Sequence, residues 1–139
     1  MEMNSKPSHI PAATRRFFIQ FLLKGMPAPP ALWAGLSTGL PTLISLLSEA
    51  MATELSVPGY SRVRIGQEDW SLTPDGTGAS TERPVFRNGS ESSWPLVASV
   101  FLATAQEGDE GSLVLWAPIG APRLLMPRDV LYVPLAIGY

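Results

Sequence analysis

The hydrophobic positions near the N-terminus follow a helical period. An aromatic-rich apolar stripe made of Phe17, Phe18, Phe21 and Leu22 falls on one side of a helix. Pro11 suits the first position of that helix, while Lys24 and Gly25 provide a basic last turn and a left-handed stop. We therefore expect a helix from Pro11 to Lys24 that covers one end of the domain.

A second helical pattern follows a stiff, proline-rich connector (26–30) and an expected first strand, Leu32 to Ser37. Its apolar positions are Leu40, Leu43, Ile44, Leu47 and Met51, all at helical spacing. Thr42 is a suitable cap, and Glu49 falls on the polar side. These features predict a short helix between Pro41 and Leu55.

After residue 60 every pattern is typical of β-strands. Strands are expected at 60–65, 85–86, 96–104, 113–117 and 130–137, with turn-rich loops at 71–83 and 106–111. The segments 96–104 and 113–117 are apolar on both alternating sets of positions, which predicts central strands buried on two sides. Pro134 indicates an edge or a bulge in the last strand.

Together these elements predict an all-β fold: an antiparallel β-sandwich, jelly-roll-like, with an N-terminal helix and a short inserted helix. The chain of 139 residues is expected to form a single domain over residues 11–139. Residues 1–10 show no periodicity and are expected to form an N-terminal arm.

Composition narrows the function. Charged residues make up only 16% of the chain and the net charge is -2, so the sequence carries neither the basic footprint of a nucleic-acid binder nor a polybasic patch for an anionic membrane. With no cysteine and one histidine, disulfide scaffolds and thiol catalysis are excluded, and most metal sites are disfavoured. We expect no cofactor, no metal, no nucleic-acid partner and no membrane partner.

Candidate catalytic groups are weak throughout. The single histidine, His9, lies in the expected arm, where it is a poor general base for a serine hydrolase. Adjacent acidic residues at 68–69 and 109–110 point apart instead of converging on one site. The segment 75–78 (Asp-Gly-Thr-Gly) lacks the ligand spacing of a calcium loop and the lysine of a phosphate loop, so it is interpreted as a turn. We expect a protein that is not an enzyme.

One segment superficially copies an export signal. Arg15 and Arg16 precede the apolar run 17–23, but that run has only seven residues, contains Gln20 and is closed by Lys24. It is too short to span a bilayer. We expect no export signal.

Several stretches resemble a family of small virion proteins of tailed phages, described as tail-fibre-like or head-decoration proteins. The stretches are Leu-Trp-Ala-Gly-Leu-Ser-Thr at 32–38, Thr-Glu-Leu-Ser-Val-Pro-Gly-Tyr-Ser-Arg-Val at 53–63, and strand blocks at 94–104, 111–119 and 128–134. Glu-Leu-Ser-x-x-Gly-Tyr-x-Arg is the most distinctive of them. The apolar segment 40–52 replaces a short polar loop of the family, and Val57 and Pro58 stand where glycines are usual.

This resemblance implies a structural virion protein without catalytic residues. The leading hypothesis is a capsid cement or decoration protein that binds the major capsid protein on the outside of the head and is located in the virion. A tail-fibre or baseplate component is the first alternative. A carbohydrate-binding module is the second, with Trp70 and the loop 71–83 as its platform.

Self-association as a homodimer is also expected, since two-fold pairing is the commonest closed assembly. The candidate contact residues for all of these partners, with core packing as the stronger interpretation of the helical stripes, are Lys6, Pro7, Phe17, Phe21, Leu43, Leu47, Met51 and Trp70.

Overall fold

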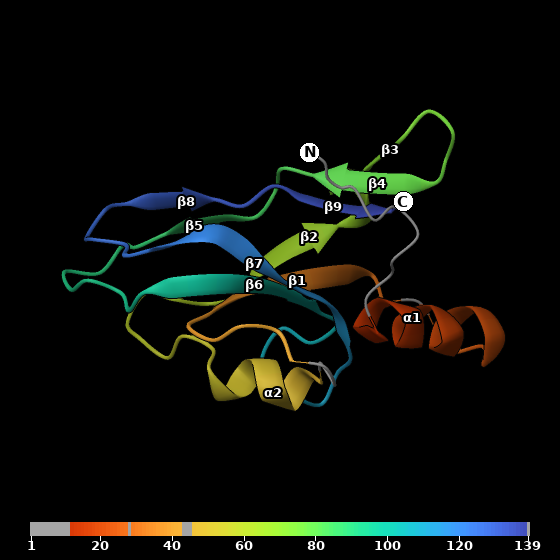
Figure 1. Ribbon diagram of the computed structural model, residues 1–139, viewed down its shortest axis with the longest axis horizontal. Coiled ribbons are helices and arrows are strands. Elements are labelled where there is room, and N and C mark those ends of the chain that lie inside the picture. The colour runs from red at the N-terminus through yellow and green to blue at the C-terminus, as the bar shows by residue number, and fades with distance from the viewer. Residues whose placement is uncertain (1–11, 28, 43–45, 139) are drawn as a thin grey trace.

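The computed structural model describes residues 12–27, 29–42 and 46–138 (Figure 1). The strands are β1 (Ala31–Ser37), β2 (Val63–Gly66), β3 (Ser71–Leu72), β4 (Gly78–Thr81), β5 (Val85–Arg87), β6 (Val97–Ala103), β7 (Leu113–Arg123), β8 (Val130–Tyr132) and β9 (Leu135–Gly138). The helical elements are α1 (Ala12–Phe18), the π-helix η2 (Ile19–Leu23), α2 (Leu47–Ala52) and the 3₁₀ turn η3 (Gln67–Asp69).

All strand pairs are antiparallel, and they form one larger sheet with two small ones. The larger sheet has the order β2-β1-β6-β7, and the small sheets are β3-β4-β9 and β5-β8. In Figure 1 the two small sheets lie on one side of the larger sheet and α2 on the other. The predicted all-β class with antiparallel sheets is confirmed.

The larger sheet is buried on both faces because its strands carry two alternating apolar sets. On one face, Val100 and Leu102 of β6 join the main core, with Phe86 and Leu131 from the β5-β8 sheet opposite. On the other face, Phe101 of β6 belongs to a second cluster beneath α2. The prediction that 96–104 is a strand buried on two sides is therefore confirmed.

Strand β7 differs from its predicted central position, because it lies at the edge of the sheet order. It is nevertheless apolar at its start because α1 packs against it. Leu113 faces Ala103 and Leu115 faces Leu102, so Val114 is the extra residue of a bulge. The buried hydroxyl of Thr14 in α1 donates to the Val114 carbonyl oxygen at 2.6 Å.

The predicted N-terminal helix is present, but its second half is wider than an α-helix. The N–H of Lys24 donates to the carbonyl of Ile19, five residues back, at 3.1 Å. Gly25 ends the helix with φ +70°, as its sequence position predicted. Pro11, the predicted first residue, lies outside the described residues.

The inserted helix is shorter than the predicted span from Pro41 to Leu55, because α2 begins only at Leu47. The reason is the Glu49 carboxylate, which accepts the backbone N–H of Leu46 at 2.9 Å and the Thr42 hydroxyl at 2.7 Å. Leu46 is thereby fixed as the cap, and Leu40 stays in an exposed extended segment. Leu43 and Ile44 lie outside the described residues.

Proline also divides the expected last strand. Pro134 separates β8 from β9, and the chain leaves β5 as partner and takes β4 instead. The loop predicted at 71–83 contains the β3-β4 hairpin. The strand predicted from Tyr60 begins only at Val63, since residues 57–60 form a turn with Gly59 at φ +83°.

Candidate functional site

The most polar buried cluster comes from the Glu-Leu-Ser-x-x-Gly-Tyr-x-Arg stretch. Arg62 donates through Nε and Nη2 to both oxygens of the Glu54 carboxylate and through Nη1 to the Ala105 carbonyl, all at 2.9 Å. The Tyr60 hydroxyl donates to Glu54 at 2.6 Å and accepts the backbone N–H of Leu36 at 3.0 Å. We call Glu54, Tyr60 and Arg62 the polar lock.

The polar lock joins three of the stretches that carry the family resemblance. Gly35 of β1 lies opposite Phe101 of β6, and a methyl group on Gly35 would come within 2.3 Å of the Phe101 ring. The guanidinium of Arg62 also lies over the Phe101 ring, 5.1 Å from its centre. The buried ring of Phe101 therefore fills the space that the glycine leaves and carries the cation of the lock.

Burial and the neighbouring Glu54 carboxylate raise the pKa of Tyr60 well above its ordinary value near 10. The tyrosine thus stays protonated as the donor to Glu54. The Arg62 and Glu54 side chains are only 2% and 12% exposed, and they neutralise each other. These bonds connect residues 54–62, which precede β2, to Leu36 of β1 and to Ala105 in the loop after β6. The polar lock therefore has a structural role.

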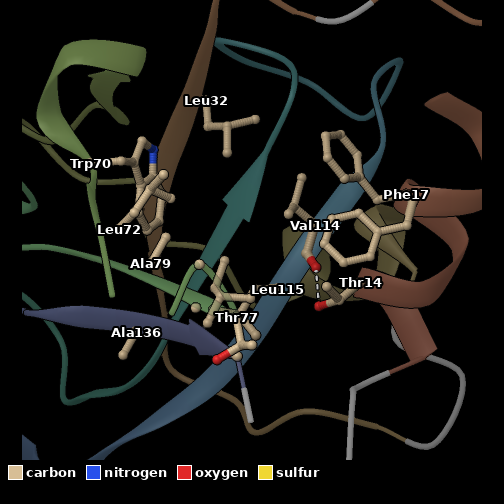
Figure 2. Close-up of a pocket in the computed structure, with 15 residues that line it drawn as sticks. Thr14, Phe17, Leu32, Trp70, Leu72, Thr77, Ala79, Val114, Leu115 and Ala136 are labelled. Carbon is tan, nitrogen blue, oxygen red and sulfur yellow. Dashed lines mark hydrogen bonds between the residues drawn. The ribbon is translucent and has the colours of Figure 1, made fainter. Parts of the chain in front are cut away.

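An apolar cavity of about 520 Å³ lies between α1 and the sheets. Figure 2 shows Thr14 and Phe17 on the α1 side of the cavity, with Trp70 and Leu72 across from them. Val114 and Leu115 of β7 and Ala136 and Ile137 of β9 complete much of the wall. Such a cavity fits an apolar group far better than a charged one.

Trp70 lies in the wall of this cavity, half-buried, and not on an open surface. It packs against the main core. The loop 71–83 is exposed around it, and its centre is a hydrogen-bonded turn in which Asp75 accepts the hydroxyls of Thr73 and Thr77, each at 2.8 Å. The first of these bonds, followed by those from Thr77, lowers the pKa of Asp75.

The other predicted contact residues are distributed between core and surface. Phe17 and Phe21 are half-buried, with ring centres 4.4 Å apart, and Phe17 packs on the main core. Leu47, the first residue of α2, is buried against the larger sheet, and Met51 of the same helix is half-buried. Lys6, Pro7 and Leu43 lie outside the described residues.

The structure reveals two exposed apolar surfaces, and the first of them includes Phe18 and Leu22 of the stripe that we expected to pack on the domain. The helix patch, on the outer side of α1 and η2, consists of Phe18, Ile19, Leu22, Leu23 and Met26. The end patch, just outside the paired ends of β6 and β7, consists of Leu96, Leu124 and Met126. The signal for the first was available, because the run 17–23 is apolar on both faces of a helix, but only one face can pack on the domain.

The two patches lie at opposite ends of the β6-β7 pair. Thr14 of α1 contacts the start of β7 at Val114, whereas Leu124 directly follows its end. In Figure 1, α1 lies at one end of the long axis and the connections 88–96 and 124–129 lie at the other. These connections are tied together by hydrogen bonds, including Trp94 N–H to the Leu125 carbonyl at 2.8 Å.

Within residues 12–27, 29–42 and 46–138, no group of three or more histidine or acidic side chains is arranged to hold a metal ion. No helix in the same part of the chain is long and apolar enough to cross a membrane.

Comparison with known proteins identifies no relative: no family model matches the chain, and no curated protein matches it.

Proposed function

We propose that this chain is a non-enzymatic structural protein of a tailed-phage virion, a cement protein that binds the major capsid protein on the outer surface of the head. The observation that carries the proposal is the pair of apolar patches at opposite ends of one sheet. A module with adhesive surfaces at both ends can bridge two neighbours.

The geometry supports bridging in size as well as in chemistry. The paired length of β6 and β7 is set by β6, whose six steps from Val97 to Ala103 at about 3.3 Å each place the two ends of the pair roughly 20 Å apart. Between them lies the larger sheet, buried on both faces and locked by Glu54 and Arg62, so the two ends are held at a fixed distance. Apolar patches rimmed by polar residues are typical of protein interaction sites.

The family resemblance supports the same assignment. Its stretches meet at Gly35, Phe101 and Arg62, so they act together as a folding unit. A jelly-roll-like sandwich is part of this proposal.

Fractionation of virions tests it directly. In purified tail-less heads of the phage that encodes the chain, quantitative mass spectrometry should find it in hundreds of copies, because cement occupies most equivalent positions of a shell. Presence in isolated tails and absence from heads would instead identify a tail-fibre or baseplate component.

The end patch provides a variant test. Leu96→Gln combined with Leu124→Gln should weaken rebinding to heads stripped of the protein, while Leu72→Gln, an exposed leucine on the β3-β4 hairpin, serves as the matched control. Deletion of residues 1–10 should also weaken attachment and leave the sandwich folded. Equal binding of all variants to heads would contradict the bridging role of the end patch.

A carbohydrate-binding module is the second candidate, and it depends on Trp70, which lies half-buried in the wall of the apolar cavity and not on an open platform. Binding on a glycan array that is lost in Trp70→Ala would support it. Indifference to glycans would favour the cement protein.

A further inference from the structure

The α1-η2 segment is apolar on two faces, but only one of them is covered. Ala13, Thr14 and Phe17 face the domain. On the outer side Leu22 and Leu23 are each 76% exposed, and unlike the isolated Leu72 they have exposed apolar neighbours in Phe18, Ile19 and Met26. A helix of this composition is typical of a buried position, and no other element among the described residues covers its outer side.

The outer side has the geometry of a helix-packing surface. Phe18 and Leu22 are four residues apart, as are Ile19 and Leu23 beside them, and Met26 follows the end of the helix at Gly25. These side chains together form one apolar surface along the outer side of α1 and η2.

We propose that the helix patch pairs with the same patch of a second copy of this chain around a two-fold axis. This inference rests on the proposed function, since it names the partner at one of the two ends. With about 200 Å² for a fully exposed residue of this size, the exposed parts of the five side chains amount to about 600 Å² per copy. Pairing would therefore remove about 1,200 Å², the lower limit for a specific interface.

An antiparallel arrangement of the two helices separates part of their positive charge. Residues 12–27 contain Arg15, Arg16 and Lys24 and no acidic residue. Antiparallel pairing around the two-fold axis places the two copies of Arg15 at opposite ends of the apolar seam, whereas Lys24 directly follows the central leucines, so both of its copies must point away from the axis into water. The apolar centre, Leu22 and Leu23, then lies close to the axis.

Sedimentation equilibrium of the full chain tests the pairing. At about 10 µM the wild-type protein should sediment as a dimer, twice the chain mass of 15.0 kDa. Leu22→Gln with Leu23→Gln keeps helix propensity and charge and should raise the dissociation constant at least roughly 100-fold, tenfold for each leucine. Leu72→Gln, also at 76% exposure, should leave the dimer intact.

A second readout does not depend on affinity. The chain has no cysteine, so Leu23→Cys places one thiol near the axis, and mild oxidation should give a disulfide-linked dimer much faster than Leu72→Cys does. A wild-type monomer at 100 µM, or dissociation by Leu72→Gln equal to that by the double variant, would overturn the proposal. So would co-sedimentation of the monomer with phosphatidylglycerol vesicles that is lost in Leu22→Gln/Leu23→Gln, since the patch would then be a lipid contact.

The two proposals fail separately. A dimer in solution with no protein in heads or tails would refute the virion role and leave the pairing intact. A monomer in solution that is abundant in heads would refute the pairing alone.

Discussion

The polar lock and the helix patch solve opposite problems. Glu54, Tyr60 and Arg62 are polar groups withdrawn from water, and each has partners inside the domain. Leu22 and Leu23 are apolar groups left in water, without a covering layer in the described residues. In the polar lock, hydrogen bonds within the chain offset the free-energy cost of burying polar groups. The helix patch, in contrast, leaves apolar surface available for contact with another molecule.

The contrast separates residues whose identity is set by the folding of the domain from residues whose identity is not. A buried ion pair tolerates little change, because removal of one partner strands the other in a medium of low polarity. An exposed apolar side chain contributes little to the free energy of unfolding of the monomer, so folding does not constrain which residue stands there. Substitutions in the two regions should therefore differ sharply in their effect on folding.

The largest effect is expected at the lock itself. Arg62→Ala leaves the Glu54 carboxylate buried without its cation and should lower the free energy of unfolding by about 3–5 kcal/mol. Arg64→Ala is the matched control, because the pair of Arg64 and Glu68 is exposed, and about 0–1 kcal/mol is expected there. Urea unfolding monitored by circular dichroism measures both, and equal losses would show that the lock contributes no more than a surface pair.

Gly35→Ala should rank second. The added methyl group meets the buried ring of Phe101 at 2.3 Å, and that ring is held between β1 and Arg62. Overpacking of this kind costs about 1–3 kcal/mol. Gly76→Ala is no substitute as a control because of its positive φ, whereas Gly89→Ala has open space and should change the midpoint of thermal unfolding little.

Alkaline pH gives a graded test of the lock. The folded-state pKa of Tyr60 is raised, so the native protein keeps a proton that the unfolded chain loses above pH of about 10. The stability contributed by the protonated tyrosine is fully present below that pH and declines as the pH rises, by about 1.4 kcal/mol per unit. Tyr60→Phe should flatten this decline, and an unchanged slope in that variant would assign the decline to other groups.

A loss of similar size to that of Gly35→Ala is expected where the helix joins the sheet. Thr14→Val keeps the shape of the side chain but removes the hydroxyl that donates to the Val114 carbonyl. The unpaired buried carbonyl should cost about 1–3 kcal/mol of stability. The α1 amides of the variant should also exchange hydrogen faster than those of the wild-type protein, while the β6 amides change less. Protection of α1 equal to that of the wild-type protein would show that the hydroxyl is dispensable.

The smallest effect belongs to the helix patch. Measured at a dilution where the protein is monomeric, Leu22→Gln with Leu23→Gln should change the free energy of unfolding by no more than about 0.5 kcal/mol. At concentrations that favour pairing, the same variant should lose the concentration dependence of its thermal midpoint. A large loss in the monomer would mean that these leucines pack inside the domain.

The sequence predicted those elements whose signals are local. Gly25 ends the first helix and Pro134 divides the last strand, and each acts through its own backbone. The start of α2 was missed because it depends on one carboxylate, Glu49, that reaches two donors outside the helix. β7 was taken for a central strand because α1 covers its start, and sequence alone does not show which element covers an edge.

The candidate surfaces were harder still to predict. The family resemblance singles out the motif that contains Glu54 and Arg62, but its physical role depends on Phe101 and on the Ala105 carbonyl, far away in the chain. The helix patch consists of residues whose character is plain in the sequence. Which face of the helix remains open is decided by tertiary packing, and only the structure provides that.

The free edge of β7 has a consequence for copies of this protein held close together. Its outer half contains Pro118 and Pro122, which offer no N–H to an incoming strand. Edge strands that do offer a regular ladder invite growth from chain to chain into fibres. The two prolines oppose such growth, so that crowded copies are directed away from open-ended stacking and toward contacts made by side chains.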